Sequence, residues 1–158
     1  MQDAYNRLDL RYAVEWFPGE AGEQPEPLLV PDLRVDDHAL LEGFTMDLRE
    51  LVASTRRNGE FWIFTCGCGE PGCAGIEEPV RILHCPEEVV WQIPRAIRGR
   101  FDEDSFREYA FNRTAYFDAV REALARAKQL SAGLAHKDCI GPYGFDCDQL
   151  HDLVVEEW

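Results

Sequence analysis

The hydrophobic residues between Leu8 and Trp16 alternate with polar ones, which is the pattern of a β-strand with one buried face. We therefore predict a strand over 8–16 whose alternating residues face the core, namely Leu8, Leu10, Tyr12, Val14 and Trp16. The next stretch, 18–27, is rich in Pro, Gly and Glu and is typical of an exposed loop. A second strand is expected over 28–35, with Pro31 placing it at a sheet edge because proline has no N–H to donate.

After this strand the hydrophobic residues recur every three to four positions instead of every second position. Phe44, Leu48, Leu51 and Val52 recur at helical spacing, which predicts a helix near 44–57 that ends before Gly59. Aromatic and β-branched residues then predict a strand over 60–66. Two further strands, 79–85 and 88–94, are separated by a short turn and are expected to form a hairpin.

The C-terminal third of the chain alternates between clear and ambiguous patterns. The segment 101–112 fits a strand or a helix, whereas 114–130 has the stripe and alanine content of a helix. The last stretch, 138–158, predicts a turn followed by a short helix or strand. With no internal repeat and no long linker, residues 1–158 are expected to form a single compact α+β domain, a mostly antiparallel sheet packed against two or three helices.

Charge narrows the classes of partner. Thirty Asp and Glu against sixteen Lys and Arg give a formal net charge of −14, which repels nucleic-acid phosphates and attracts cationic proteins. The one dense basic run, 95–100, is short. No apolar stretch is long enough to span a membrane, and the N-terminus lacks the pattern of a secretory signal. We therefore expect a cytoplasmic protein that binds neither nucleic acid nor membrane.

The sequence FTCGCGEPGCAGI, residues 64–76, has the strongest chemical character in the chain. In a reducing compartment its cysteines are expected to be thiols or metal ligands rather than disulfides. Zinc takes four thiolate or imidazole ligands, and the glycines allow a loop to curl around an ion. The candidate ligands are Cys66, Cys68, Cys73, His84 and Cys85. The alternative is a tight turn with packed thiols, and the Cys-x-x-Cys spacing of a redox site is absent.

This loop also carries a resemblance. The stretch Cys-Gly-Cys-Gly-x-x-Gly-Cys-x-Gly, followed by a strand containing Trp91 and an aromatic-rich helix, resembles a group of small uncharacterised bacterial proteins. The resemblance covers about residues 60–130 and implies a domain type without a reaction.

Catalytic chemistry is the third interpretation. A thiol enzyme would pair Cys139 with His136, or Cys73 with His84, because a neighbouring imidazole activates a thiol. Adjacent carboxylates such as Asp36 and Asp37 are expected to be solvated. The sequence contains no phosphate loop, no Gly-x-Ser-x-Gly and no His-Glu-x-x-His, which makes an enzyme the less favoured class.

The favoured hypothesis is an acidic binding protein that neutralises a cationic partner, as immunity proteins of bacterial toxin systems neutralise a cognate toxin. A zinc-stabilised regulatory or scaffolding domain is the alternative, and a thiol-dependent enzyme is the second alternative. Acidic residues and a terminal tryptophan are concentrated near the C-terminus, where they suit a hot spot for a basic protein. The predicted contact residues are Asp146, Asp148, Asp152, Glu156, Glu157 and Trp158.

Overall fold

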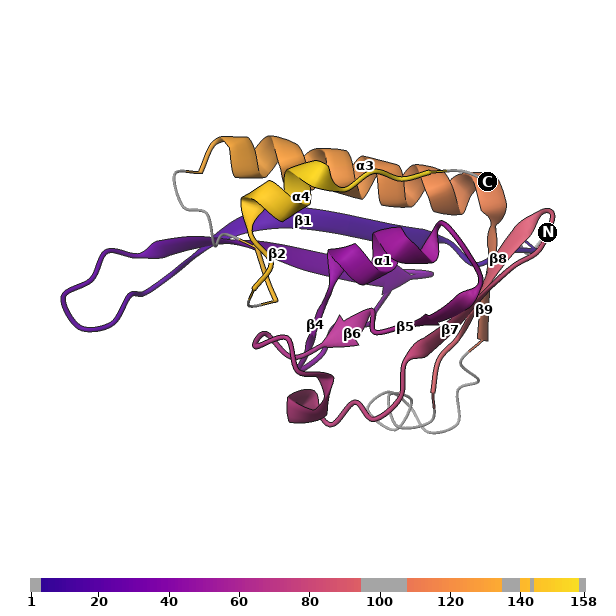
Figure 1. The fold of residues 1–158 in the computed structure, drawn as a ribbon, viewed down its shortest axis with the longest axis horizontal. Coiled ribbons are helices and arrows are strands. Elements are labelled where there is room, and N and C mark those ends of the chain that lie inside the picture. The colour runs from indigo at the N-terminus through magenta and orange to yellow at the C-terminus, as the bar shows by residue number, and fades with distance from the viewer. Residues whose placement is uncertain (1–3, 95–107, 135–139, 143, 157–158) are drawn as a thin grey trace.

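The chain folds into three antiparallel sheets packed with two main helices and a shorter one (Figure 1), which confirms the predicted α+β class. A computed structural model describes residues 4–94, 108–134, 140–142 and 144–156. Within these ranges the sheets have the strand orders β1-β2-β3, β4-β6 and β5-β7-β8-β9. None of the helices in this part of the chain combines the length and the apolar character needed to cross a membrane.

The first sheet is a long hairpin formed by β1 (Leu8–Phe17) and β2 (Glu26–Val35), with the short β3 (His38–Ala39) at the end of β2. Both long strands occur where the sequence predicts them. Pro31 lies opposite Tyr12, and β3 pairs with β2 only at Arg34 and Val35. The proline therefore lies on a stretch of β2 whose outer edge is not covered by β3, in agreement with its predicted edge position.

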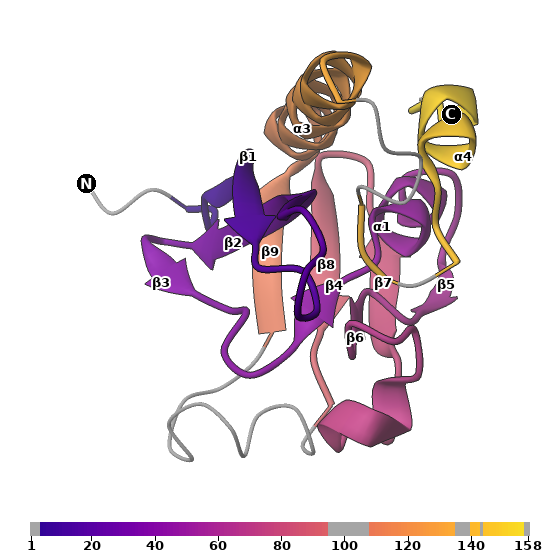
Figure 2. The same ribbon diagram turned by 90° about the vertical axis from the view of Figure 1, so that its left-hand side faces the viewer.

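The predicted buried face of β1 is wrong at its outer end. Leu10 and Tyr12 are buried, but the side chain of Trp16 is 65% exposed. Figures 1 and 2 show α3 lying along the hairpin, and Figure 1 shows the tip of the hairpin extending beyond α3. Alternation continued to Trp16 because the strand continues, whereas the core that buries one face of the strand ends earlier.

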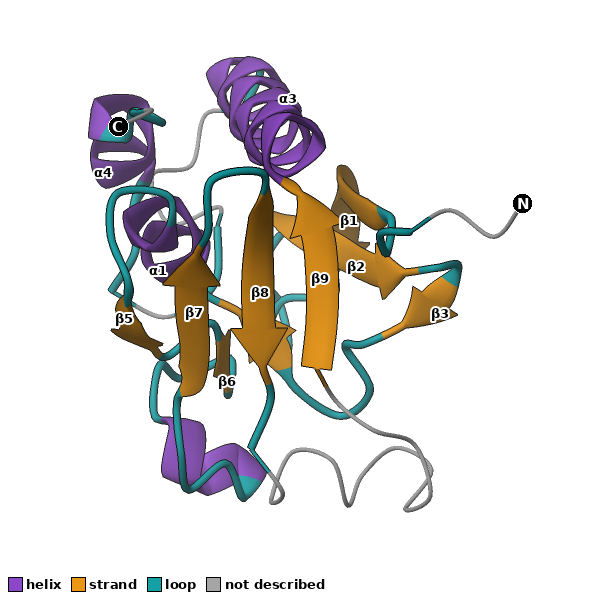
Figure 3. Cartoon of the chain, turned by 90° about the vertical axis from the view of Figure 1, so that its right-hand side faces the viewer, coloured by secondary structure: helices purple, strands orange, loops and turns teal. Residues whose placement is uncertain are grey.

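The four-stranded sheet contains the predicted hairpin, in which β7 (Val80–His84) pairs with β8 (Glu88–Gln92). Its outer strands are β5 (Gly59–Phe61) and β9 (Glu108–Asn112), as Figure 3 shows. The described part of the ambiguous segment 101–112 is thus a strand. The single strand predicted over 60–66 is divided instead, because β5 pairs with β7 while β6 (Phe64–Thr65) pairs with β4 (Thr45–Met46).

Three helices complete the described fold, α1 (Leu48–Ser54), α3 (Arg113–Ala132) and α4 (Cys147–Asp152). Helix α3 confirms the prediction over 114–130. Helix α1 is shorter than predicted, because Asp47 caps it by accepting the N–H of Arg49 and the residues before Asp47 belong to β4. The segment 138–158, for which the sequence predicts a short helix or a strand, contains the helix α4.

Aromatic side chains from α3, β8, β9 and β6 fill the centre of the core. Trp91 and Tyr116 are completely buried, with ring centroids 6.2 Å apart in an edge-to-face arrangement. The indole N–H of Trp91 donates to the Tyr116 hydroxyl at 3.2 Å, and Ser54 Oγ lies 3.0 Å from that hydroxyl. Because Ser54 Oγ donates to the carbonyl of Leu51 at 2.6 Å, the Tyr116 O–H donates to Ser54. Burial raises the pKa of Tyr116 to about 12, so the phenol stays protonated and able to donate.

The hydrogen bonds from Trp91 to Tyr116 and from Tyr116 to Ser54 form a relay, called the Tyr116 relay below. Removing the Tyr116 hydroxyl should interrupt it. We expect Tyr116→Phe to lower the free energy of unfolding by about 1–3 kcal/mol, because buried polar groups of Trp91 and Ser54 lose a partner. The control is Tyr109→Phe, at a half-buried tyrosine of the same sheet, with an expected change within about 0.5 kcal/mol. Urea unfolding followed by circular dichroism measures both values, and equal effects would contradict the relay.

Candidate functional site

The loop that carries Cys66, Cys68 and Cys73, called the cysteine loop below, follows β6. It passes through the 3-10 turn η1 (Pro71–Ala74) and leads into β7 of the four-stranded sheet. Gly69 and Gly75 have φ values of 90° and 72°, in the left-handed region that favours glycine. The sequence prediction of a glycine-shaped turn is therefore confirmed at these two positions.

The thiols of this loop have different surroundings. Cys66 is half-buried and packs against the hydrophobic core, whereas Cys68 and Cys73 are exposed. The alternative of packed thiols therefore holds for Cys66 but not for Cys68 and Cys73. Cys85, after β7, is half-buried, and the described cysteines are free of disulfides.

His84, the imidazole candidate for a metal ligand, has both ring nitrogens in contact with other groups. Its Nε2 lies 2.7 Å from the carbonyl oxygen of Ser54, so this nitrogen carries the proton and donates. Nδ1 then accepts from Arg113 at 3.2 Å. Burial, followed by the charge of Arg113, lowers the pKa of His84 despite the hydrogen bond to Ser54. The structure therefore favours a neutral imidazole that ties β7 to α1 and α3.

Among the residues that the structure describes, no three His, Cys, Asp or Glu side chains gather closely enough to hold a metal ion. Cys66, Cys68, Cys73, His84 and Cys85 all lie within the described ranges, and the structure does not bring them together. The pairing of Cys73 with His84 is likewise not formed, because the imidazole contacts Ser54 and Arg113.

The predicted C-terminal contact set is partly engaged within the protein. Asp146 caps α4 and forms a capping box with Gln149. The tail is docked through its backbone, since Lys128 donates to the carbonyl of Leu153 at 2.6 Å and Arg56 to that of Val154 at 3.2 Å. Glu156 lies 3.8 Å from Arg56. Asp148 and Asp152 are exposed. Glu157 and Trp158 lie outside the described residues, as do His136, Cys139 and the basic run 95–100.

A pocket of about 350 Å³ lies along the outer edge of β2. Its walls come from β1 and β2, from the cysteine loop and from the segment before α4, whose Ile140 forms a parallel bridge with Leu29. Most of the lining is apolar. The lining residues are Phe17, Leu28, Leu29, Val30, Pro31, Thr45, Gly67, Ile140, Gly141, Gly144 and Phe145.

Exposed aromatic residues and carboxylates are found at the outer end of the β1–β2 hairpin, where Phe17 lines this pocket. Trp16 is 65% and Phe17 43% exposed. Glu15 lies opposite Leu28 in the register, and Glu20 and Glu23 follow in the loop of the hairpin. No described arginine or lysine pairs with these three carboxylates. We call Glu15, Trp16, Phe17, Glu20 and Glu23 the hairpin tip.

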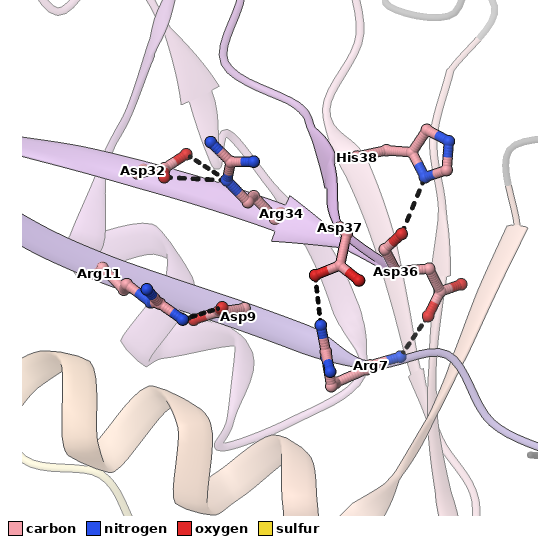
Figure 4. Close-up of polar contacts among 8 residues, drawn as sticks. All are labelled: Arg7, Asp9, Arg11, Asp32, Arg34, Asp36, Asp37 and His38. Carbon is pink, nitrogen blue, oxygen red and sulfur yellow. Dashed lines mark hydrogen bonds and ion pairs between the residues drawn. The ribbon is translucent and has the colours of Figure 1, made fainter.

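The base of the same hairpin is neutralised by contrast (Figure 4). Arg11 binds Asp9 and Arg34 binds Asp32 along their own strands, and the register places each arginine opposite the other strand's aspartate. At the β2–β3 turn, Asp36 accepts the N–H of Arg7 at 2.7 Å, while Asp37 pairs with the Arg7 side chain. The unbalanced negative charge of the hairpin is therefore concentrated at the hairpin tip.

Sequence reasoning missed the hairpin tip because it assigned Trp16 to the core. The signal was present in the next residues, since a loop rich in Pro, Gly and Glu carries a strand end away from the core.

Comparisons with known protein families, with curated proteins and with solved structures give no match to this chain.

The exposed thiols lead to a test of the zinc alternative. We expect Cys68→Ser and Cys73→Ser each to change the free energy of unfolding by less than about 0.5 kcal/mol, because both side chains are exposed. Cys66→Ser should cost about 1 kcal/mol or more, since Cys66 packs against the core. Thermal unfolding with and without a chelator measures this. Equal losses at all three positions, reproduced by the chelator, would support a bound metal.

The lowered pKa of His84 predicts a pH dependence of stability. An unfolded histidine takes up a proton near its ordinary pKa of 6.5, whereas His84 in the folded protein does so at lower pH. Stability from this group is therefore present above pH 6.5 and is lost as the pH falls through and below that value. Urea unfolding between pH 7.5 and 5 should show a smaller decline for His84→Gln than for the wild type. Parallel profiles would contradict the assignment.

Proposed function

We propose that this chain is an acidic binding protein that neutralises a cationic protein partner, in the manner of an immunity protein acting on a cognate toxin in the cytoplasm. The observation that carries the proposal is the hairpin tip, where Phe17 lines an apolar pocket, Trp16 is mostly exposed, and the three carboxylates pair with no arginine or lysine that the structure describes.

The aromatic residues supply the apolar part of such an interface. Tryptophan and similarly large side chains dominate binding energy where they become buried against a partner. Phe17 already lines the pocket, and Trp16 stands beside it in sequence with most of its surface in solvent. An apolar side chain of the partner that enters the pocket removes both its own surface and that of Phe17 from water.

The carboxylates supply attraction at longer range. The chain has a formal net charge of −14. Within the β1–β2 hairpin the charges at the base are paired, so the hairpin tip is the negative end of the hairpin. A field of this sign accelerates association with a basic surface, and the acceleration falls as salt screens it. The docked C-terminal tail carries acidic residues as well, but Arg56 and Lys128 lie against it. The hairpin tip is therefore the stronger candidate for the contact surface.

The experiment begins with capture of partners from a lysate of the source organism, followed by association kinetics with the purified partner. The triple variant Glu15→Lys, Glu20→Lys, Glu23→Lys should slow association at least about tenfold at low salt and much less at high salt. Trp16→Ala with Phe17→Ala should mainly speed dissociation, since it removes buried contact area.

The matched control reverses three acidic residues of the tail region, Asp148, Asp152 and Glu156, with the same change in net charge. It should slow association by less than about threefold if the hairpin tip is the contact surface. An equal or larger effect of the tail variant would move the contact to the C-terminus. Capture of only acidic or neutral proteins, or unchanged rates for all variants, would contradict the proposed function.

A further inference from the structure

A second pocket, of about 550 Å³, lies on the other side of the cysteine loop. Gly67 of this loop lines the first pocket, and Gly69 to Gly72 line the second, so one loop forms a wall of both. The remaining walls come from the start of α1, from Trp62 and from β6. The lining residues are Asp47, Glu50, Trp62, Thr65, Gly69, Glu70, Pro71, Gly72 and Ile76.

Thr65 contributes a buried hydroxyl that lacks a hydrogen-bond partner. The residue is only 2% exposed, and its Oγ1 has no partner among the described residues. An unsatisfied buried hydroxyl costs stability, and in native proteins such a group commonly serves a ligand or an ordered water. Thr65 also belongs to the wall of this pocket, so an occupant that donates a hydrogen bond at this point would satisfy the hydroxyl.

The acidic residues give the pocket a negative charge. Asp47 is neutralised within the protein, because Arg49 binds it through Nε and Nη2 at 3.0 and 2.7 Å. The guanidinium of Arg49 also lies over the ring of Phe145, which keeps it on this pair. Glu50 is half-buried and accepts the backbone N–H of Trp62 at 2.8 Å, so its carboxylate is held in place. Glu70 adds a second, exposed carboxylate at the rim.

Trp62 and Gly72 shape the opening. The side chain of Trp62 is 38% exposed, so part of the indole is accessible for stacking. Gly72 lies outside the left-handed region, and a Cβ added there would meet nothing within 4 Å. Neither backbone conformation nor internal packing therefore requires glycine at this position, and the space above it is open to a ligand.

We propose that this pocket receives an arginine side chain of the cationic partner, with the guanidinium between Glu50 and Glu70, stacked on Trp62 and donating to Thr65. A guanidinium is planar, has five donors and no acceptor, pairs with carboxylates and stacks on indole, which matches each of these groups. The inference rests on the proposed function and names one residue type through which the partner binds.

The test uses N-acetylarginine amide as the probe and N-acetylcitrulline amide as its neutral isostere, with the full chain observed by NMR. The indole N–H signal of Trp62, assigned with Trp62→Phe, should shift saturably with the arginine probe. The citrulline probe should bind at least about tenfold more weakly. Equal shifts with both probes, or none, would overturn the assignment of the pocket.

Variants separate a binding role from a structural one. Glu50→Gln keeps an oxygen for the Trp62 N–H but removes the charge, and should weaken arginine binding about tenfold. Glu122→Gln, at an exposed position of α3, is the matched control and should change nothing. Thr65→Val should weaken binding while raising the midpoint of thermal unfolding, because it removes the unsatisfied hydroxyl. A Thr65→Val protein that is less stable and binds arginine normally would overturn the role of the Thr65 hydroxyl in the pocket.

The same variants distinguish this inference from the proposed function. If the partner is captured but binds Glu50→Gln and Thr65→Val as well as it binds the wild type, the pocket assignment fails while the proposed function stands. If the arginine probe binds but no basic protein is captured, the assignment of the guanidinium to a protein partner fails together with the proposed function.

Discussion

The hydroxyl of Tyr116 joins parts of the fold that are far apart in sequence. It accepts from Trp91 on β8 and donates to Ser54 on α1, and Tyr116 itself belongs to α3. Because every donor in this relay has an acceptor, the polar groups stabilise a core that is otherwise apolar. His84 adds a second connection, from β7 to the Ser54 carbonyl and to Arg113. Together these bonds fix α1 and α3 on the four-stranded sheet. The β1–β2 hairpin forms a separate sheet that lies along α3.

The local patterns predicted most of the secondary structure. Alternation located β1, and the strand expected after the Pro-, Gly- and Glu-rich loop is β2. A turn between two β-rich runs located the β7–β8 hairpin, and alanine-rich helical spacing located α3. The errors have a common cause, which is that local pattern does not report what the element packs against. Trp16 continues the alternation of β1 beyond the core, and residues 60–66 read as one strand although two different sheets share them. Tertiary context decided both cases.

The candidate site was less predictable. The cysteine loop is conspicuous in the sequence because of its thiols, yet in the structure its glycines line the two pockets. Gly67, Gly69 and Gly72 belong to the pocket walls, while Cys68 and Cys73 are exposed. The carboxylates were visible as composition but could not be sorted. An acidic residue can cap a helix, as Asp146 does, pair with an arginine, as Asp32 does, or have no arginine or lysine partner in the described part of the chain, as Glu20 does. Composition alone does not distinguish these cases.

The extension of the β1–β2 hairpin beyond the core has a consequence for how such a protein can diverge. Residues at the hairpin tip are exposed, so substitutions there change the proposed contact surface with little effect on folding. Gene duplicates of this chain could therefore acquire different partners through changes in a few tip residues, while the Tyr116 relay and the sheets are kept. Under the proposed function, recognition and stability are carried by separate parts of the molecule, and selection can act on one without a cost to the other.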